Sequence, residues 1–275
     1  ADQKGRNHPH ARLGQLMSGS THARVALALV LAVSLAGCGA TNLPFLGDDA
    51  ADDGEAEAIA TDAVAEMQSV SAYNFTMTQV VAFGQNEVNM TADGTVNHTS
   101  ERLYMDVTES VLTNTTRSKE FTEVYVVDDT RCWRDTSTDS GWNSTNVSGV
   151  WNQGLSVDGQ GELLNATGTT ATLRANQTVG AETAYVVEIT PNVNALKRVV
   201  ANDSSVDLSE VTVRNATITQ YVSQDDRQLL RTTMHVTFVQ QGRTTTVDLE
   251  MTYSDYDDVG PITIPETEDG ELVCP

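Results

Sequence analysis

Strict alternation of apolar and polar residues dominates the chain after about residue 73. In four stretches an apolar residue occupies nearly every second position: 73–77, 88–92, 103–107 and 121–127. This period of two is typical of half-buried antiparallel strands. Turn-forming residues separate the stretches at Gly84-Gln85-Asn86, Asp93-Gly94 and Asp128-Asp129. The pattern predicts four strands connected as a meander.

Two segments show a helical period instead. Apolar residues between Ala56 and Val70 recur at intervals of three and four, with acidic residues on the other faces, which predicts a helix before the first strand. Pro191-Asn192 opens a second, shorter helix, because asparagine is a favoured N-cap residue. Alternation in 185–189, 211–222, 230–239 and 247–253 predicts one strand before this helix and three after it. The Gly-, Ser- and Asn-rich stretch 136–161 is predicted to be a long loop or short helices that cross the sheet.

This order of elements predicts an α+β fold. A large curved antiparallel sheet, or half-barrel, with helices packed on its concave face satisfies it, because both kinds of element must bury an apolar side. About 220 residues without an internal linker indicate one domain over residues 54–275.

The N-terminal region predicts export and lipid attachment. The apolar run from Val25 to Gly37 is shorter than the roughly 20 residues that span a bilayer and has the length of a signal-peptide core. It closes with Leu35-Ala36-Gly37-Cys38, the arrangement of a lipobox, in which the cysteine is lipidated after cleavage. Residues 1–37 are then an upstream extension followed by a signal peptide, and residues 38–53 are the lipidated cysteine and an acidic linker. An ordinary signal peptide with an incidental cysteine is the alternative to this lipoprotein at the outer face of the cell membrane.

Acidic residues are in large excess. Without residues 1–37 the chain has 12 basic and 37 acidic residues, a net charge of −25, and Lys119 and Lys197 are its only lysines. At molar salt the Debye length falls to about 3 Å, so the self-repulsion of such a surface is screened. We interpret the excess as adaptation to high salt, with a cation-binding surface as the alternative. Nucleic acid is excluded as a partner on charge grounds.

Sequons and cysteines fit an exported protein. Once Cys38 is assigned to the anchor, two cysteines remain, Cys132 and Cys274. In an oxidising compartment they can form a disulfide, and two free thiols are the alternative. Asn-x-Ser/Thr sequons exceed the number expected by chance and predict a glycoprotein. They lie at Asn74, Asn89, Asn97, Asn114, Asn143, Asn146, Asn165, Asn176, Asn202 and Asn215.

Residues suited to catalysis or metal binding are few. After residue 37 the histidines are His98 and His235, and two isolated histidines do not predict a triad or a zinc site. Alternation places His235 away from the apolar side of its strand. The acid pairs fall at predicted turns, where aspartate is favoured by turn geometry, and Asp255, Asp257 and Asp258 do not match an EF-hand loop. We therefore predict a protein that is not an enzyme and uses neither cofactor nor metal.

Two short segments carry a family resemblance. Residues 63–75, AVAEMQSVSAYNF, run from the first helix into the first strand, and residues 253–265, YSDYDDVGPITIP, close the sheet. Together they resemble the LolA-like lipoprotein-carrier superfamily, which includes a bacterial periplasmic lipoprotein chaperone and mycobacterial glycolipid-binding lipoproteins. The chain is also similar to small surface lipoproteins of haloarchaea. The resemblance implies a half-barrel plugged by helices around a cavity for acyl chains, although the low aromatic content of 5% and the polar middle segment depart from it.

The leading functional hypothesis is a lipid-anchored surface protein that binds a hydrophobic or amphiphilic ligand such as a lipid or acyl chain. The rival is a sensory or scaffolding domain that binds a protein partner. Five aromatic residues are candidates for lining a ligand site, with core packing as their alternative role. They are Tyr73, Phe75, Trp133, Trp142 and Trp151.

Overall fold

The computed structural model describes residues 53–113, 115–138, 141–147, 163–203, 211–266 and 270–274. The signal region, Cys38 and Trp151 lie outside these ranges. The elements are α2 (Asp53–Ser69), β1 (Ala72–Phe83), β2 (Asn86–Asn97), β3 (Arg102–Leu112), β4 (Arg117–Val127), β5 (Thr130–Asp135), β6 (Asn143–Asn146), β7 (Thr170–Val179), β8 (Glu182–Thr190), α5 (Val193–Asp203), β9 (Val211–Ser223), β10 (Leu229–Gln240) and β11 (Arg243–Ser254). None of the helices in these ranges is long and apolar enough to cross a membrane.

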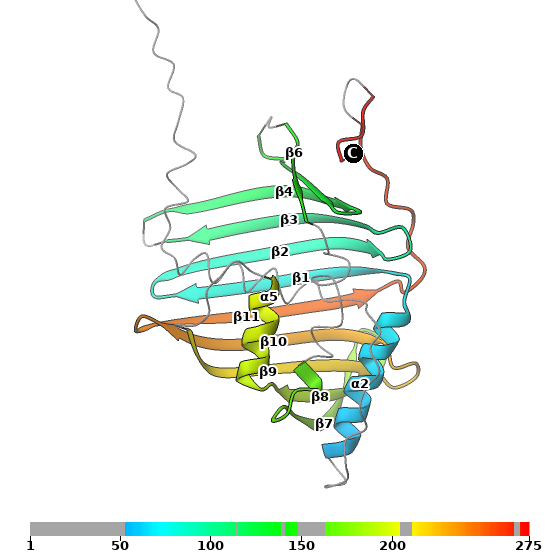
Figure 1. Cartoon of the computed structure of the whole chain (residues 1–275), viewed down its shortest axis with the longest axis vertical. Coiled ribbons are helices and arrows are strands. Elements are labelled where there is room, and N and C mark those ends of the chain that lie inside the picture. The colour runs from blue at the N-terminus through cyan, green and yellow to red at the C-terminus, as the bar shows by residue number, and fades with distance from the viewer. Residues whose placement is uncertain are drawn as a thin grey trace, which may run out of the picture.

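The described strands form one antiparallel sheet of eleven strands in the order β6-β5-β4-β3-β2-β1-β11-β10-β9-β8-β7 (Figure 1). The chain builds one half by successive hairpins from β1 outward to β6. It then forms the opposite edge at β7 and returns inward to β11, so that the first and last strands pair at the centre. Strands β6 and β7 remain as edges and the sheet does not close. The predicted large open antiparallel sheet is confirmed.

One face of the sheet, which we call the inner face, carries the main core. On β1 it bears Tyr73, Phe75 and Met77, which are 4–5% exposed, as the alternation predicted. Helix α2 buries its apolar side, including Ala60 and Met67, in the same core and contacts β7, β8, β9 and β10. Apolar burial of this kind stabilises a fold by about 25 cal/mol per Å².

Helix α5 begins as predicted. Asn192 Oδ1 accepts hydrogen bonds from the backbone N–H of Asn194 at 2.9 Å and of Ala195 at 3.1 Å, so Asn192 is the N-cap. Ala195 and Leu196 are 0% and 2% exposed and join the core. In Figure 1 the helix crosses the middle strands of the sheet.

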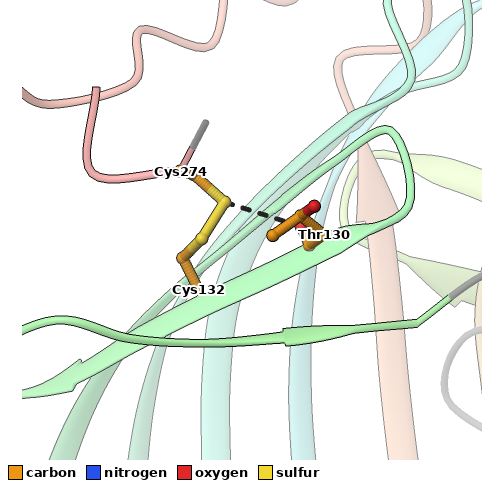
Figure 2. Close-up of a disulfide and its surroundings, with 3 residues drawn as sticks. All are labelled: Thr130, Cys132 and Cys274. Carbon is orange, nitrogen blue, oxygen red and sulfur yellow. Dashed lines mark hydrogen bonds between the residues drawn. A yellow bond between two sulfur atoms is a disulfide. The ribbon is translucent and has the colours of Figure 1, made fainter. Parts of the chain in front are cut away.

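The C-terminal segment covers part of the opposite, outer face. Ile262 and Ile264 pack with Tyr125, Val273 and the two cysteines in a second apolar cluster, while Trp142 packs at its edge. Cys132 of β5 and Cys274 form a disulfide with a Cα–Cα distance of 5.7 Å. Figure 2 shows this disulfide beside the carbonyl oxygen of Thr130, which lies 3.5 Å from Cys274 Sγ. The disulfide thereby fastens the end of the chain to the β5 side of the sheet.

Four local predictions differ from the structure. The Asp93-Gly94 turn was wrong, because both residues lie inside β2, where Gly94 pairs with Phe75 and with Met105. Strands β5, β6 and β7 were not predicted, and β6 lies in the stretch 136–161 that was predicted to be a long loop or short helices. Strand β7 is an edge strand with mostly exposed side chains and a register shift between Arg174 and Gln177, so it lacks a clean alternation. The short β5 follows its hairpin turn too closely to show a period.

Candidate functional site

The predicted ligand-lining aromatics are divided between the two faces. Tyr73 and Phe75 are buried in the main core, where the Tyr73 ring centre lies 5.8 Å from that of Tyr253. Trp133 is partly buried against the same core. Trp142 lies on the outer face, with its ring centre 5.7 Å from that of Tyr125. The structure therefore brings three of the five candidates to the inner face, and only Trp133 among them keeps substantial exposure.

Trp133 shares its corner of the inner face with Arg131. The guanidinium carbon of Arg131 lies 5.2 Å from the centre of the Trp133 ring, within the range of a cation–π contact. The register sets Arg131 opposite Val126 and Trp133 opposite Val124, two valines that are 5% and 2% exposed. The Arg131 side chain therefore lies beside buried apolar side chains.

Arg131 has no acidic partner among the residues that the structure describes. Its Nε is buried without a hydrogen-bond partner, and among the described residues no carboxylate forms an ion pair with it. Burial lowers the pKa of the Arg131 guanidinium from its usual value. We call the pair Arg131 and Trp133 the arginine corner.

A second feature of the inner face is an apolar patch that is incompletely covered. Phe83, Val88, Met90 and Val107 on β1, β2 and β3 pack against the core but stay partly exposed. We call these four residues the open patch. It lies on the half of the sheet away from β7–β10, the strands that α2 contacts.

The open patch has an acidic border. Glu109 of β3 pairs directly with Glu120 of β4, and alternation places both on the inner face. Burial, and then the neighbouring charge of Glu120, raise the pKa of Glu109. On the other side, Gln79 of β1 is 2% exposed and its Nε2 has no hydrogen-bond partner among the described residues.

The outer face holds a shallow groove of about 310 Å³. Its lining side chains form two rows across four adjacent strands, Thr78–Glu250–Thr233–Thr219 and Val80–Asp248–His235–Thr217. Most of these side chains are short, which leaves the depression between longer neighbours. His235 is 43% exposed, in agreement with its predicted outward orientation.

On this face a hydroxyl, an imidazole and a carboxylate lie next to one another, and the last two line the groove. His235 Nδ1 lies 2.6 Å from Asp248 Oδ1, and His235 Nε2 lies 3.2 Å from Thr237 Oγ1. Acyl transfer also needs free donors for the developing oxyanion. The backbone amides of these central strands are instead used in the β-ladder on both sides. The groove can therefore form hydrogen bonds with a ligand, but the backbone amides of its strands are not free to stabilise an oxyanion, as a hydrolytic site requires.

Two acids near the C-terminus form hydrogen bonds that connect the segment after β11 to the start of β1. Asp257 Oδ1 accepts hydrogen bonds from Ser71 N at 2.7 Å and Ser71 Oγ at 2.5 Å, which lower the pKa of Asp257. Asp255 Oδ2 accepts from Asn74 Nδ2 at 2.9 Å and from Ser254 Oγ at 2.9 Å, with the same effect on its pKa. In the parts of the chain that the structure describes, no three His, Cys, Asp or Glu residues are grouped as metal ligands.

Three solved structures match this chain over most of their own length at low sequence identity. LppX, a lipoprotein of Mycobacterium tuberculosis, is 9% identical, with 77% of this chain and 100% of that chain covered and a TM-score of 0.46. LprF from Mycobacterium bovis is 14% identical, with 78% and 98% covered and a TM-score of 0.47. A putative outer membrane lipoprotein-sorting protein domain from Vibrio parahaemolyticus is 8% identical, with 74% and 94% covered and a TM-score of 0.26. No protein-family model and no curated protein matches the sequence.

Sequence reasoning did not find the arginine corner. A strand of six residues is too short to show an alternation that would assign Arg131 and Trp133 to a face. The neighbouring sequence also does not show whether a carboxylate lies near the arginine in the fold. The available signal was the composition: in a chain with so few basic residues, Arg131-Cys132-Trp133 places an arginine two positions from a tryptophan. In any strand, residues two positions apart share a face.

Proposed function

We propose that this protein is a non-enzymatic lipoprotein of the cell envelope that binds an apolar or amphiphilic ligand on its inner face. The open patch carries the proposal. Contiguous apolar surface that stays accessible to solvent often marks a binding site when it is large. Here Phe83, Val88, Met90 and Val107 continue the apolar face of the core beyond the strands that α2 contacts.

The composition of this surface fits a ligand with an apolar part. Its centre is aliphatic and aromatic, and its borders carry Glu109 and Gln79, groups that can orient a polar end. Ligand sites commonly combine an apolar lining with a few placed polar groups. The outer groove instead combines Val80, Met234 and Leu249 with four threonines, His235, Asp248 and Glu250, so polar side chains interrupt its apolar surface.

The anchor is the second element of the proposal. Lipidation of Cys38 would hold the domain at the outer face of the membrane through the acidic linker, within reach of membrane lipids. A Cys38→Ser variant should then be released into the medium or remain unprocessed. Retention of this variant in the membrane fraction at the wild-type level would contradict the anchor.

A location at the cell surface would also expose the protein to glycosylation. The exposed sequon residues Asn143, Asn146, Asn165, Asn176 and Asn215 offer accessible amides. Asn74 is less suited, since its side chain donates to Asp255 and accepts from Thr95 Oγ1 at 2.6 Å. We propose that glycan is attached at the exposed group, which glycopeptide mapping of host-purified protein would test.

The ligand is tested by native mass spectrometry of the secreted Cys38→Ser domain, purified from a high-salt host. We expect a reproducible bound mass in the lipid range. Val88→Asn should weaken binding of the neutral apolar dye Nile red, whereas Val80→Asn, the same exchange on the outer face of the neighbouring strand, should not. A domain that is purified without ligand and does not bind the dye would overturn the proposal and favour the rival, a protein-binding domain.

A further inference from the structure

We propose that the arginine corner recognises an anionic head group, a carboxylate, phosphate or sulfate, of the amphiphile bound at the inner face. This inference rests on the proposed function and specifies the chemical class of its ligand.

Arg131 differs from the three arginines of this acidic protein that approach a carboxylate. Arg134 pairs with Glu123 at 2.7 Å, Arg174 with Glu188 at 2.6 Å, and Arg231 approaches Glu250 at 4.0 Å. Arg131 is partly buried, yet it has no carboxylate partner among the described residues. Because charges removed from water are normally paired, this one is poised for a partner from outside the chain.

The chemistry of the corner selects an anion. A guanidinium presents a planar fork of donors that matches carboxylate and phosphate oxygens, and its Nε–H is one arm of that fork. In Arg131 the Nε is buried and has no hydrogen-bond partner, while Trp133 flanks the guanidinium plane. Attraction between charges is stronger here than at the surface, because partly buried pairs are less screened by salt.

The surroundings select an anion that carries an apolar chain. Arg131 is opposite Val126, which pairs with Leu103, and Leu103 pairs with Val96 of β2. Val107 of the open patch lies four residues from Leu103 along β3, about 14 Å at 3.4 Å per residue. A head group at the corner would therefore leave a chain directed along an apolar face toward the open patch.

Glu109 and Glu120 are too far from Arg131 to repel an anion bound there. Glu120 lies six residues from Val126 on β4, about 20 Å along the strand, and Glu109 is its direct partner. In high salt this separation exceeds the Debye length several times. The two ends of the inner face therefore carry charges of opposite sign, negative at Glu109 and Glu120 and positive at Arg131.

The experiment uses the Cys38→Ser domain in high salt and measures displacement of Nile red by dodecanoate, dodecanol and dodecylamine, which share one chain length. A charge-assisted hydrogen bond contributes about 1.5–3 kcal/mol, so Arg131→Gln should weaken dodecanoate binding by about tenfold or more. Dodecanol binding should stay unchanged. Arg134→Gln is the matched control, because Arg134 lies on the same strand and over a tryptophan, but on the outer face and paired with Glu123.

The outcomes separate this inference from the function on which it rests. If all three ligands bind and Arg131→Gln does not weaken dodecanoate, the head-group site is wrong and the apolar ligand stands. If none binds, the proposed function itself fails. Inorganic phosphate is titrated separately: binding as tight as that of dodecanoate would assign the corner to a free anion and overturn the amphiphile. Arg131→Lys, which keeps the charge without the fork, should give an intermediate loss and guards against misfolding of the glutamine variant.

Discussion

The ring of Phe75 packs directly over Gly94 of the neighbouring strand, with Cζ 2.6 Å from the position that a β-carbon on residue 94 would occupy. The carbonyl oxygen of Tyr104 lies equally close, at 2.6 Å. Glycine is therefore required in the middle of β2, although it is usually unfavourable in a strand. The aromatic ring compensates by covering the backbone that the glycine leaves bare.

Replacing this glycine should destabilise the protein. In Gly94→Ala the new methyl group would overlap Phe75 and the β3 backbone, and overpacking of this kind costs about 1–3 kcal/mol. Urea unfolding at constant salt measures the change. Gly260→Ala is the control, because a β-carbon on residue 260 would have no atom within 4 Å and the φ of Gly260 is not positive. Equal stability of Gly94→Ala and wild type would show that the two strands can separate without cost.

Gly94 also shows where sequence reasoning reached its limit. The alternation of β1–β4 and β8–β11 and the cap at Asn192 were predictable because they depend on neighbours in the chain. Asp93-Gly94 has the composition of a turn, and only the ring of Phe75, contributed by another strand, makes it a strand interior. The arginine corner was unpredictable for the same reason, since the burial of Arg131 depends on the side chains of β4 and β5 together.

Loss of the disulfide should weaken the fold strongly. Cys132 and Cys274 are separated by 142 residues, and in the chain-entropy model a loop of this length contributes about 5 kcal/mol. The double variant Cys132→Ser/Cys274→Ser should lower the free energy of unfolding by up to that amount, measured in urea. Reduction of the wild-type protein should reproduce most of the loss. Peptide mapping without reduction is the independent check, and free thiols at both positions would refute the pairing.

Acid should weaken the link between Ser71 and Asp257. The two hydrogen bonds from Ser71 lower the pKa of Asp257, so its folded value lies below the unfolded value of about 3.9. The stabilisation is complete above that unfolded value and is lost as the pH falls through the folded pKa. Asp257→Asn should therefore have a lower Tm than wild type at neutral pH, and the difference should shrink toward zero in strong acid.

Asp258→Asn serves as the reference for this measurement, because Asp258 is exposed and its carboxylate is not part of the Ser71 pair. Its Tm should follow wild type across the range. A constant difference between Asp257→Asn and wild type at every pH would mean that the hydrogen-bond geometry, rather than the charge, supplies the stabilisation.

Glu109 should show the opposite dependence on pH. Its pKa is raised by burial and by Glu120, so the folded state binds its proton more tightly than the unfolded state, whose pKa is about 4.3. Stability is then lost as the pH rises from the unfolded toward the folded pKa, and the penalty is complete above the folded value. Glu109→Gln should raise the Tm at neutral pH, and this advantage should disappear below about pH 4. Glu87→Gln, an exposed acid on the outer face of β2, is the control with the same change in charge. A lower Tm for Glu109→Gln at neutral pH would show that the ionised carboxylate, held beside Glu120 at the border of the open patch, has a stabilising partner in solution.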